Sequence, residues 1–141
     1  MIFTKDKITV KLYDSRKEMG EIAASDTAAK IEELLLVKDE INIIFAAAPS
    51  QNEFLASLVK ENRIDWSRIN AFHMDEYIGL EEDAPQRFGH FLKESIFGKV
   101  PFKQVNYING KALPSEECAR YEALLKQYPA DIVCLGIGEN G

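Results

Sequence analysis

An acidic pair stands where an apolar stretch near the middle of the chain gives way to a loop. Asp75 and Glu76 follow the mainly apolar segment 69–74 and precede Gly79. This pattern is typical of the carboxyl end of a buried strand, and open parallel sheets bind ligands in the crevice beyond such ends. A carboxylate that is dry on one side there can transfer protons, so Asp75 is a candidate general base. Acidic residues are also common after strands, and a solvated loop role for both residues therefore stays open.

A second candidate site follows the apolar run 41–46. The small side chains of Ala47 and Ala48 would let a ligand approach the backbone, and Ser50 adds a hydroxyl at the start of a predicted helix. Together these features would suit a phosphate group. The residues alone favour a simpler role, in which Ser50 caps the helix through the Ser-x-x-Glu pattern of segment 50–53.

The glycine-rich segment 136–141 is a third candidate, because it follows the apolar run 131–135. It lacks the complete G-x-G-x-x-G spacing, so it is a weak cofactor signal, and a tight turn leaving a buried strand explains it equally well. If the sheet is parallel, the ends after segments 41–46, 69–74 and 131–135 lie on one edge and face one crevice. That convergence predicts a ligand site there.

Strands and helices alternate along the chain, which predicts a doubly wound, Rossmann-like α/β layer with a mainly parallel sheet. Runs without polar alternation, such as 41–46, indicate strands that are buried on both faces. We expect one domain over residues 1–141, forming the N-terminal part of a longer protein, because a strand and glycine-rich loop normally lead into another helix. The predicted strands are 8–13 (at an edge), 41–46, 69–74, 104–108 and 131–135, and the predicted helices are 15–37, one from residue 50, 85–97 and 114–128.

The composition limits the possible partners. The 141 residues carry 17 Lys and Arg against 23 Asp and Glu, a formal charge of −6 that argues against non-specific nucleic-acid binding but not against a phosphorylated small molecule. No apolar run suits a signal peptide or a membrane span. Cys118 and Cys134 lack metal-ligand spacing, so we expect reduced thiols in a cytoplasmic protein. His73 alternates with Phe72 and Met74 and is interpreted as a packed sheet histidine.

Two segments of the chain together resemble the glucosamine-6-phosphate deaminase (isomerase) family. Residues 72–80 read Phe-His-Met-Asp-Glu-Tyr-Ile-Gly-Leu and match that family's MDEY-x-GL segment almost letter for letter. Residues 135–141 look like the start of its GxGxxGHIxFNEP segment. The order and separation of the two segments fit, as does the helix after Ser50, so the resemblance covers about the whole chain.

The resemblance implies a Rossmann-like fold and the conversion of glucosamine 6-phosphate to fructose 6-phosphate and ammonia, without a redox cofactor or metal. Asp75 falls on the family's enolisation base, and Ser50 falls on a Ser/Thr that holds the sugar phosphate in a loop that here includes Ala47. Gly136 falls on a backbone contact to the substrate, and Asn140 on an Asp/Asn that assists the ring-opening histidine. Family members form homo-oligomers, so we expect one for the complete protein.

The chain departs from the family pattern in two places. The family's phosphate loop reads TGGT or SGGT, whereas residues 47–50 read Ala-Ala-Pro-Ser, and proline removes one N–H donor. The family's next residue after position 141 is the ring-opening histidine, so we expect residues 1–141 alone to lack deaminase activity. Two alternatives stay open. One is a 6-phosphogluconolactonase-like hydrolase, for which Asp-Glu-Arg is expected at 75–77. The other is a non-catalytic sugar-phosphate-sensing domain, which the altered loop at 47–50 keeps open.

Overall fold

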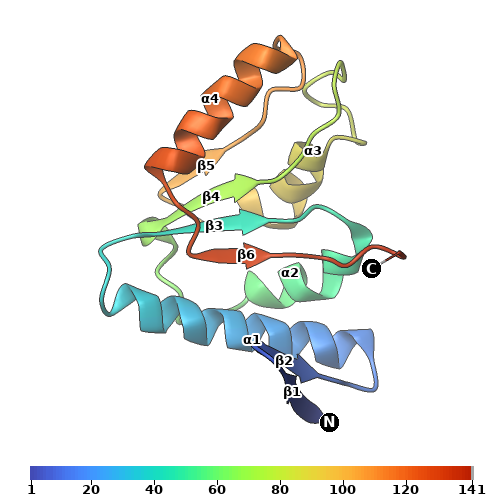
Figure 1. Ribbon diagram of the computed structural model, residues 1–141, viewed down its shortest axis with the longest axis vertical. Helices are drawn as coiled ribbons and strands as arrows, with labels where there is room; N and C mark the ends of the chain where they lie inside the picture. Colours follow the sequence, from blue (N-terminus) through green and yellow to red (C-terminus); the bar gives the residue numbers. More distant parts are fainter. Residues whose placement is uncertain (141) are drawn as a thin grey trace.

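The computed structural model describes residues 1–140 and contains a four-stranded parallel sheet in the order β5-β4-β3-β6. In Figure 1 helices α1 and α2 lie on one side of this sheet, and α4 lies on the other. The arrangement confirms the predicted doubly wound α/β fold with a parallel sheet. The strands are β3 (Ile41–Phe45), β4 (Ile69–His73), β5 (Gln104–Asn106) and β6 (Ile132–Cys134), and the longer helices are α1 (Arg16–Leu35), α2 (Asn52–Leu58) and α4 (Pro114–Gln127).

The two central strands carry the core of the domain. All five residues of β4 are buried, and in β3 the side chains of Ile41, Ile43 and Phe45 are fully buried. The other face of β3 is partly buried, so neither strand has a fully exposed face, which explains why these segments show no polar alternation. Strands β5 and β6 have three residues each and are only partly covered, so both are shorter than expected.

Helix α1 begins where the sequence predicted. Ser15 is its N-cap, and the Ser15 hydroxyl accepts a hydrogen bond of 3.1 Å from the Glu18 backbone N–H. This bond satisfies one of the N–H groups that have no partner within the helix. Ala24, Ala28 and Ile31 are fully buried and face the core, and the helix ends at Leu35, slightly before the predicted end.

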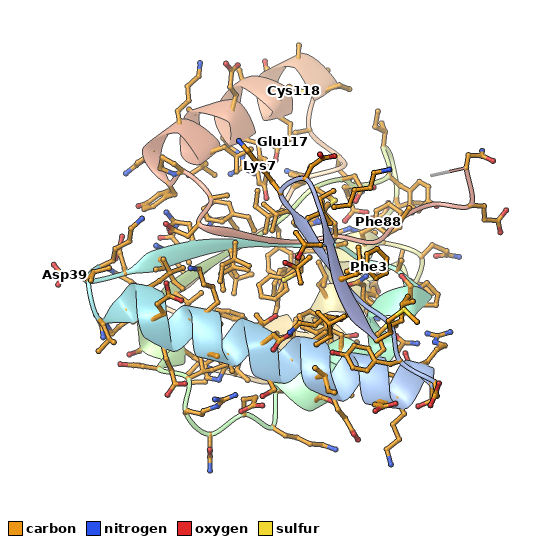
Figure 2. The ribbon with its side chains drawn as sticks, turned by 60° about the horizontal axis from the view of Figure 1, so that its bottom comes forward. Phe3, Lys7, Asp39, Phe88, Glu117 and Cys118 are labelled. Atoms are coloured by element: carbon orange, nitrogen blue, oxygen red, sulfur yellow. The ribbon has the colours of Figure 1, made fainter. Side chains whose placement is uncertain are left out.

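The first predicted strand was placed wrongly. Residues 8–13 were expected at an edge of the main sheet, but Ile8–Lys11 (β2) pairs antiparallel with Ile2–Lys5 (β1), a strand that was not predicted. Together they form a separate two-stranded ribbon, which carries Phe3 and Lys7 in Figure 2. Asp6 turns the chain in the left-handed region, with φ at 54°. Because nearly every side chain of the ribbon is exposed, its short apolar stretches gave no signal of a buried strand.

The helix expected over 85–97 begins later and changes its winding. Pro85 lies in a turn, Arg87 is extended, and α3 covers Phe88–Leu92 before the π-helical turn η3 (Lys93–Phe97). Proline at a first helical position was the sequence signal. The start is decided instead by a distant carboxylate that receives the first N–H groups of α3, as described below. Helix α4 ends within a residue of its predicted end.

Among residues 1–140 the helices are too short or too polar for any of them to cross a lipid bilayer.

Replacing one buried and one exposed leucine tests which side chains form the core. Leu58 on α2 is fully buried, so Leu58→Ala should lower the free energy of unfolding by about 2–5 kcal/mol through lost burial and a residual cavity. Leu36 is 85% exposed, and Leu36→Ala should stay within about 0.5 kcal/mol of the wild type. Urea denaturation followed by circular dichroism measures both values. Equal losses in the two variants would contradict this assignment of the core.

Candidate active site

The three predicted loops leave the sheet side by side. Phe45 of β3 is in register with His73 of β4 and with Cys134 of β6, and the Ala46 N–H extends the ladder by donating to the Cys134 carbonyl at 3.0 Å. Because the strands are parallel, the residues that follow this row emerge at one edge. Ala47, Asp75 and Gly136 therefore occupy equivalent positions at the carboxyl edge of the sheet.

Ser50 is not the helix cap that its sequence pattern predicted. The chain enters a short 3-10 turn, η1 (Pro49–Gln51), from an extended Ala48, and neither η1 nor α2 has a side-chain cap. Proline suits the first position of a helix, so the turn starts one residue before Ser50. Glu53 forms an ion pair of 2.8 Å with Arg16 instead of closing a capping box. The Ser50 hydroxyl is thus left for another role.

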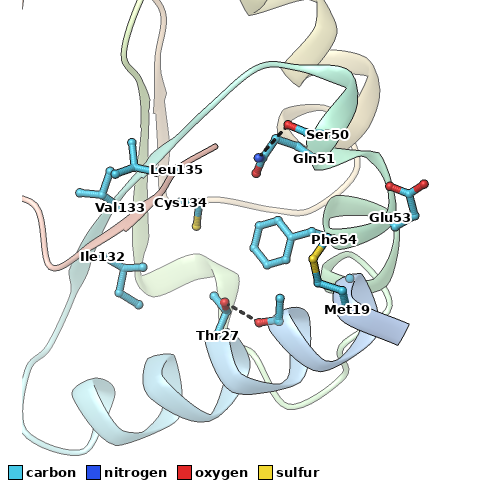
Figure 3. A pocket seen from close by; sticks show the side chains of 12 residues that line it. Met19, Thr27, Ser50, Gln51, Glu53, Phe54, Ile132, Val133, Cys134 and Leu135 are labelled. Atoms are coloured by element: carbon cyan, nitrogen blue, oxygen red, sulfur yellow. Dashed lines mark hydrogen bonds between the residues drawn. The ribbon is translucent and has the colours of Figure 1, made fainter. Parts of the chain in front are cut away.

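Ser50 and Gly136 come together beside a cavity. A Cβ added at Gly136 would lie 3.4 Å from Ser50 Oγ and 3.4 Å from Gln51 Nε2. The cavity has a volume of about 290 Å³ and opens between α1, the start of α2 and β6 (Figure 3). The structure therefore joins two candidates that are far apart in the sequence. Ala47 packs partly against the core, and Asn140 is exposed in a turn beyond Gly136.

Asp75 itself is exposed. The expected dry surroundings are absent among residues 1–140, because the neighbouring Met74 and Tyr77 are exposed as well. What the structure provides for Asp75 is a fixed backbone. The loop that carries it, residues 75–80, is called the Asp75 loop below.

Glu76 anchors the Asp75 loop. Its side chain is 1% exposed, and its carboxylate accepts hydrogen bonds from the backbone N–H groups of Tyr77 (3.0 Å), Phe88 (3.0 Å) and Gly89 (2.9 Å). Arg87 Nε lies 3.3 Å from Glu76 Oε2. Burial by itself would raise the pKa of Glu76, but the N–H donors and the Arg87 guanidinium outweigh it and hold that pKa below its usual range. Glu76 therefore fastens the loop to the start of α3 as a carboxylate.

A second anchor joins the loop to the turn after β5. The Gly79 N–H donates to the Gly110 carbonyl at 2.8 Å. A Cβ at Gly110 would lie 2.2 Å from the Tyr77 carbonyl oxygen, so only glycine allows this approach. The Tyr77 ring also stacks on Phe88, with 4.8 Å between ring centroids. The Asp75 loop is thus held from two sides.

His73 is a packed sheet residue, as predicted. It is 1% exposed, and its Nε2 accepts a hydrogen bond of 2.9 Å from the Ile108 N–H. Burial lowers the pKa of His73, in spite of the negative charges of Glu76 and Asp75. The Tyr121 hydroxyl from α4 donates to the His73 carbonyl at 2.6 Å, and burial raises the pKa of Tyr121 to about 12. Both residues are therefore neutral at pH 7 and support the end of β4.

Metal ligation has no candidate among residues 1–140, where no group of three or more His, Cys, Asp or Glu side chains is placed to hold an ion. Cys118 and Cys134 are both free thiols, as expected.

The fold and the position of the site define a doubly wound α/β protein whose candidate site lies at the carboxyl edge of its sheet. Residues 14–141 match the family of glucosamine-6-phosphate isomerases and 6-phosphogluconolactonases. Since this match covers most of the chain, the protein belongs to that family.

Individual relatives agree with this assignment. The glucosamine-6-phosphate deaminase of Listeria innocua is 35% identical over 123 residues, which are 86% of this chain and 53% of that protein. The enzyme of the same name from Bacillus cereus is 37% identical over 112 residues, which are 79% of this chain and 42% of that protein. The chain thus spans about half the length of the curated relatives it matches.

Solved structures show the same fold. A monomeric glucosamine-6-phosphate deaminase superposes with a TM-score of 0.80 at 27% identity, covering 92% of this chain and 55% of that one. The 6-phosphogluconolactonase from Thermotoga maritima superposes with a TM-score of 0.78 at 24% identity, covering 90% of this chain and 58% of that one. The second likeness shows the fold alone.

Sequence reasoning missed the parts that Gln51, Arg87 and Gly110 play at the site. Pro49 was a local signal that the helical turn starts before Ser50, which changes the role of Gln51. Asn109 and Gly110 lie in the turn that follows β5. The contact of Gly110 with Tyr77, like that of Arg87 with Glu76, has no local signal because the partners are distant in the sequence.

Replacing Glu76 tests the first anchor. Glu76→Gln should lower the free energy of unfolding at pH 7 by about 3 kcal/mol, because one amide cannot replace the carboxylate toward several donors and Arg87 loses its charged partner. The pKa of Glu76 is lower in the folded state than in the unfolded state. The stability that Glu76 contributes is therefore fully present above its unfolded-state pKa of about 4.3, and it is lost as the pH falls through its folded-state pKa. Urea unfolding between pH 7 and pH 3 measures the difference.

Glu81→Gln is the matched control for this test. Its side chain is 72% exposed and pairs with Lys111 on the surface, so its stability should match the wild type at every pH. If Glu76→Gln were as stable as Glu81→Gln at pH 7, Glu76 would not be an anchor.

Replacing Gly110 tests the second anchor. Gly110→Ala puts a methyl group against the Tyr77 carbonyl, so the Asp75 loop must shift and the bond between the Gly79 N–H and Gly110 must weaken. We expect a loss of about 1–3 kcal/mol in unfolding free energy. Hydrogen exchange at the Gly79 amide should become faster, and an unchanged exchange rate would contradict the steric argument.

Proposed function

We propose that the complete gene product carrying this chain is a glucosamine-6-phosphate deaminase, which isomerises the amino sugar phosphate and releases ammonia. The observation that carries the proposal is the meeting of the loops of Ser50, Asp75 and Gly136 at one edge of the sheet, within a chain of this family. The curated relatives of 35% and 37% identity bear that enzyme's name. Residues 1–141 are proposed as one domain of that product.

Asp75 is proposed as the general base. In an aldose–ketose isomerisation a proton moves between adjacent carbons, and a single carboxylate can carry it from one to the other. A proton-transfer group has to be held at a set distance from its substrate. The Glu76 and Gly110 anchors fix the backbone that follows Asp75, and the Tyr121 hydroxyl holds the His73 carbonyl that precedes it. Its exposure fits a group that meets a substrate rather than the core.

Ser50 and Gly136 are proposed to hold the phosphorylated end of the substrate. Their closeness supports this assignment, as does the Ser50 hydroxyl, which caps no helix. Ala47 would support the loop by packing against the core, and Asn140 would assist ring opening from the turn beyond Gly136. The lactonase alternative is less favoured, because position 77 is Tyr where that group of enzymes is expected to carry Arg.

Replacing Asp75 tests the proposed chemistry. In the complete gene product, Asp75→Asn should reduce kcat with glucosamine 6-phosphate by about 10²–10⁴-fold, because the proton acceptor is lost while the shape is kept. KM should stay near the wild-type value. Ammonia release measured in a coupled assay gives both constants, and Glu81→Gln serves as the control for loss of an acidic residue nearby.

Full activity of Asp75→Asn would remove Asp75 from the mechanism. A wild-type product that binds glucosamine 6-phosphate without releasing ammonia would favour the non-catalytic sensing domain.

A further inference from the structure

Gln51 is a buried polar residue whose hydrogen-bonding capacity is largely unused. Its side chain lies beside the cavity of the candidate site, and the residue is 7% exposed. A glutamine amide offers two donors and a carbonyl acceptor. Among residues 1–140 its one side-chain hydrogen bond is a long one, 3.4 Å from Nε2 to Ser50 Oγ. Buried amides normally have partners, so Gln51 is placed to bind something that enters the cavity.

The surroundings of Gln51 indicate where that ligand sits. Figure 3 shows the Gln51 amide next to the Ser50 hydroxyl, at the side of the cavity where β6 ends. Gly136 follows this end, and a Cβ there would be equally close to both polar side chains. The amide, the hydroxyl and the glycine backbone therefore surround one point, although they come from two segments of the chain.

Other polar groups around the cavity are already engaged. Thr27 donates to the Ala23 carbonyl at 2.7 Å, and Glu53 pairs with Arg16. Burial raises the pKa of Cys134 to about 12, so this thiol is neutral at pH 7. The side chains of Ser50 and Gln51 are the polar groups left to face a ligand.

The backbone of the loop explains why a side-chain donor is needed. Pro49 has no N–H, and the N–H of Gln51 is used within η1, where it donates to the Ala48 carbonyl at 2.9 Å. A loop that binds an anion through backbone N–H groups is therefore short of donors here. The Gln51 side chain starts from the same turn and carries N–H donors beside Ser50 Oγ.

We infer that Gln51 is a substrate-binding residue, whose Nε2 donates a hydrogen bond to the phosphate group of the substrate beside Ser50 and Gly136. This inference rests on the proposed function for the identity of the substrate. The phosphate would then be bound by two neutral side-chain donors from η1, the Ser50 hydroxyl and the Gln51 amide. In this way the Ala-Ala-Pro-Ser loop would bind phosphate although Pro49 has no N–H.

Kinetics of two variants test the inference. In the complete gene product, Gln51→Leu keeps the size but removes the donors, so KM for glucosamine 6-phosphate should rise about tenfold while kcat changes little. Gln51→Glu keeps the shape and adds a negative charge against the phosphate, so its KM should rise further. A role in packing alone would not give this order, because Glu is the closer isostere. The inhibition constant of inorganic phosphate should rise in parallel.

Gln127→Leu is the matched control, since Gln127 is exposed on α4 away from the cavity and its KM should equal that of the wild type. Thermal unfolding of all variants checks the fold, and Gln51→Glu keeps the test decisive if Gln51→Leu does not fold. A wild-type KM in either folded Gln51 variant would overturn the inference and leave the proposed function standing.

If the wild-type product does not turn over glucosamine 6-phosphate, the proposed function fails, and calorimetric titration with inorganic phosphate then decides the inference. A tenfold weaker binding by Gln51→Leu than by the wild type supports it. Equal binding, or no binding by the wild type, overturns it.

Discussion

The parallel hydrogen-bonded register of β3 with both of its neighbours is the constraint on which the site depends. Phe45 shares one row with His73 and Cys134, so the three loops that follow must leave the sheet together. Parallel strands can be joined only by crossover segments, and the helices that make these crossovers cover both faces of the sheet and bury its apolar side chains. The same ladder that builds the core therefore assembles the candidate residues.

The strand register brings together the starts of the loops after β3, β4 and β6. Buried polar contacts then fix the Asp75 loop. The Glu76 carboxylate is almost fully removed from water, which is unfavourable unless every oxygen has a partner. Here backbone N–H groups from two segments and the Arg87 guanidinium supply those partners. A buried charge of this kind specifies one arrangement, because shifting the Asp75 loop would leave Glu76 without its donors and Arg87 without its charged partner.

The Asp75 end and the Ser50 end of the site differ in the charge of their side chains and in how these are positioned. At the Asp75 end a charged side chain is exposed, and its position depends on anchors behind it. At the Ser50 end the polar side chains are neutral: Gln51 is buried, Ser50 is exposed, and both line a cavity of about 290 Å³. Pro49 stands at the start of η1, so this turn begins one residue before Ser50 and Ser50 caps no helix. Gln51 lies in the same turn, with its side chain beside the cavity.

The sequence by itself determined the parallel α/β architecture, the start of α1 and the three loops that carry the candidate residues. Hydrophobic runs, the Ser15 cap and the order of the elements are all visible in the sequence. It did not determine the β1–β2 ribbon, which lacks a buried face, or the start of α3, which Glu76 decides from a distance. Only the tertiary structure brought Ser50, Gln51 and Gly136 around one point and placed Gly110 against Tyr77. These contacts join segments that are separate in the chain, and their energy comes from packing and hydrogen bonding that no local pattern records.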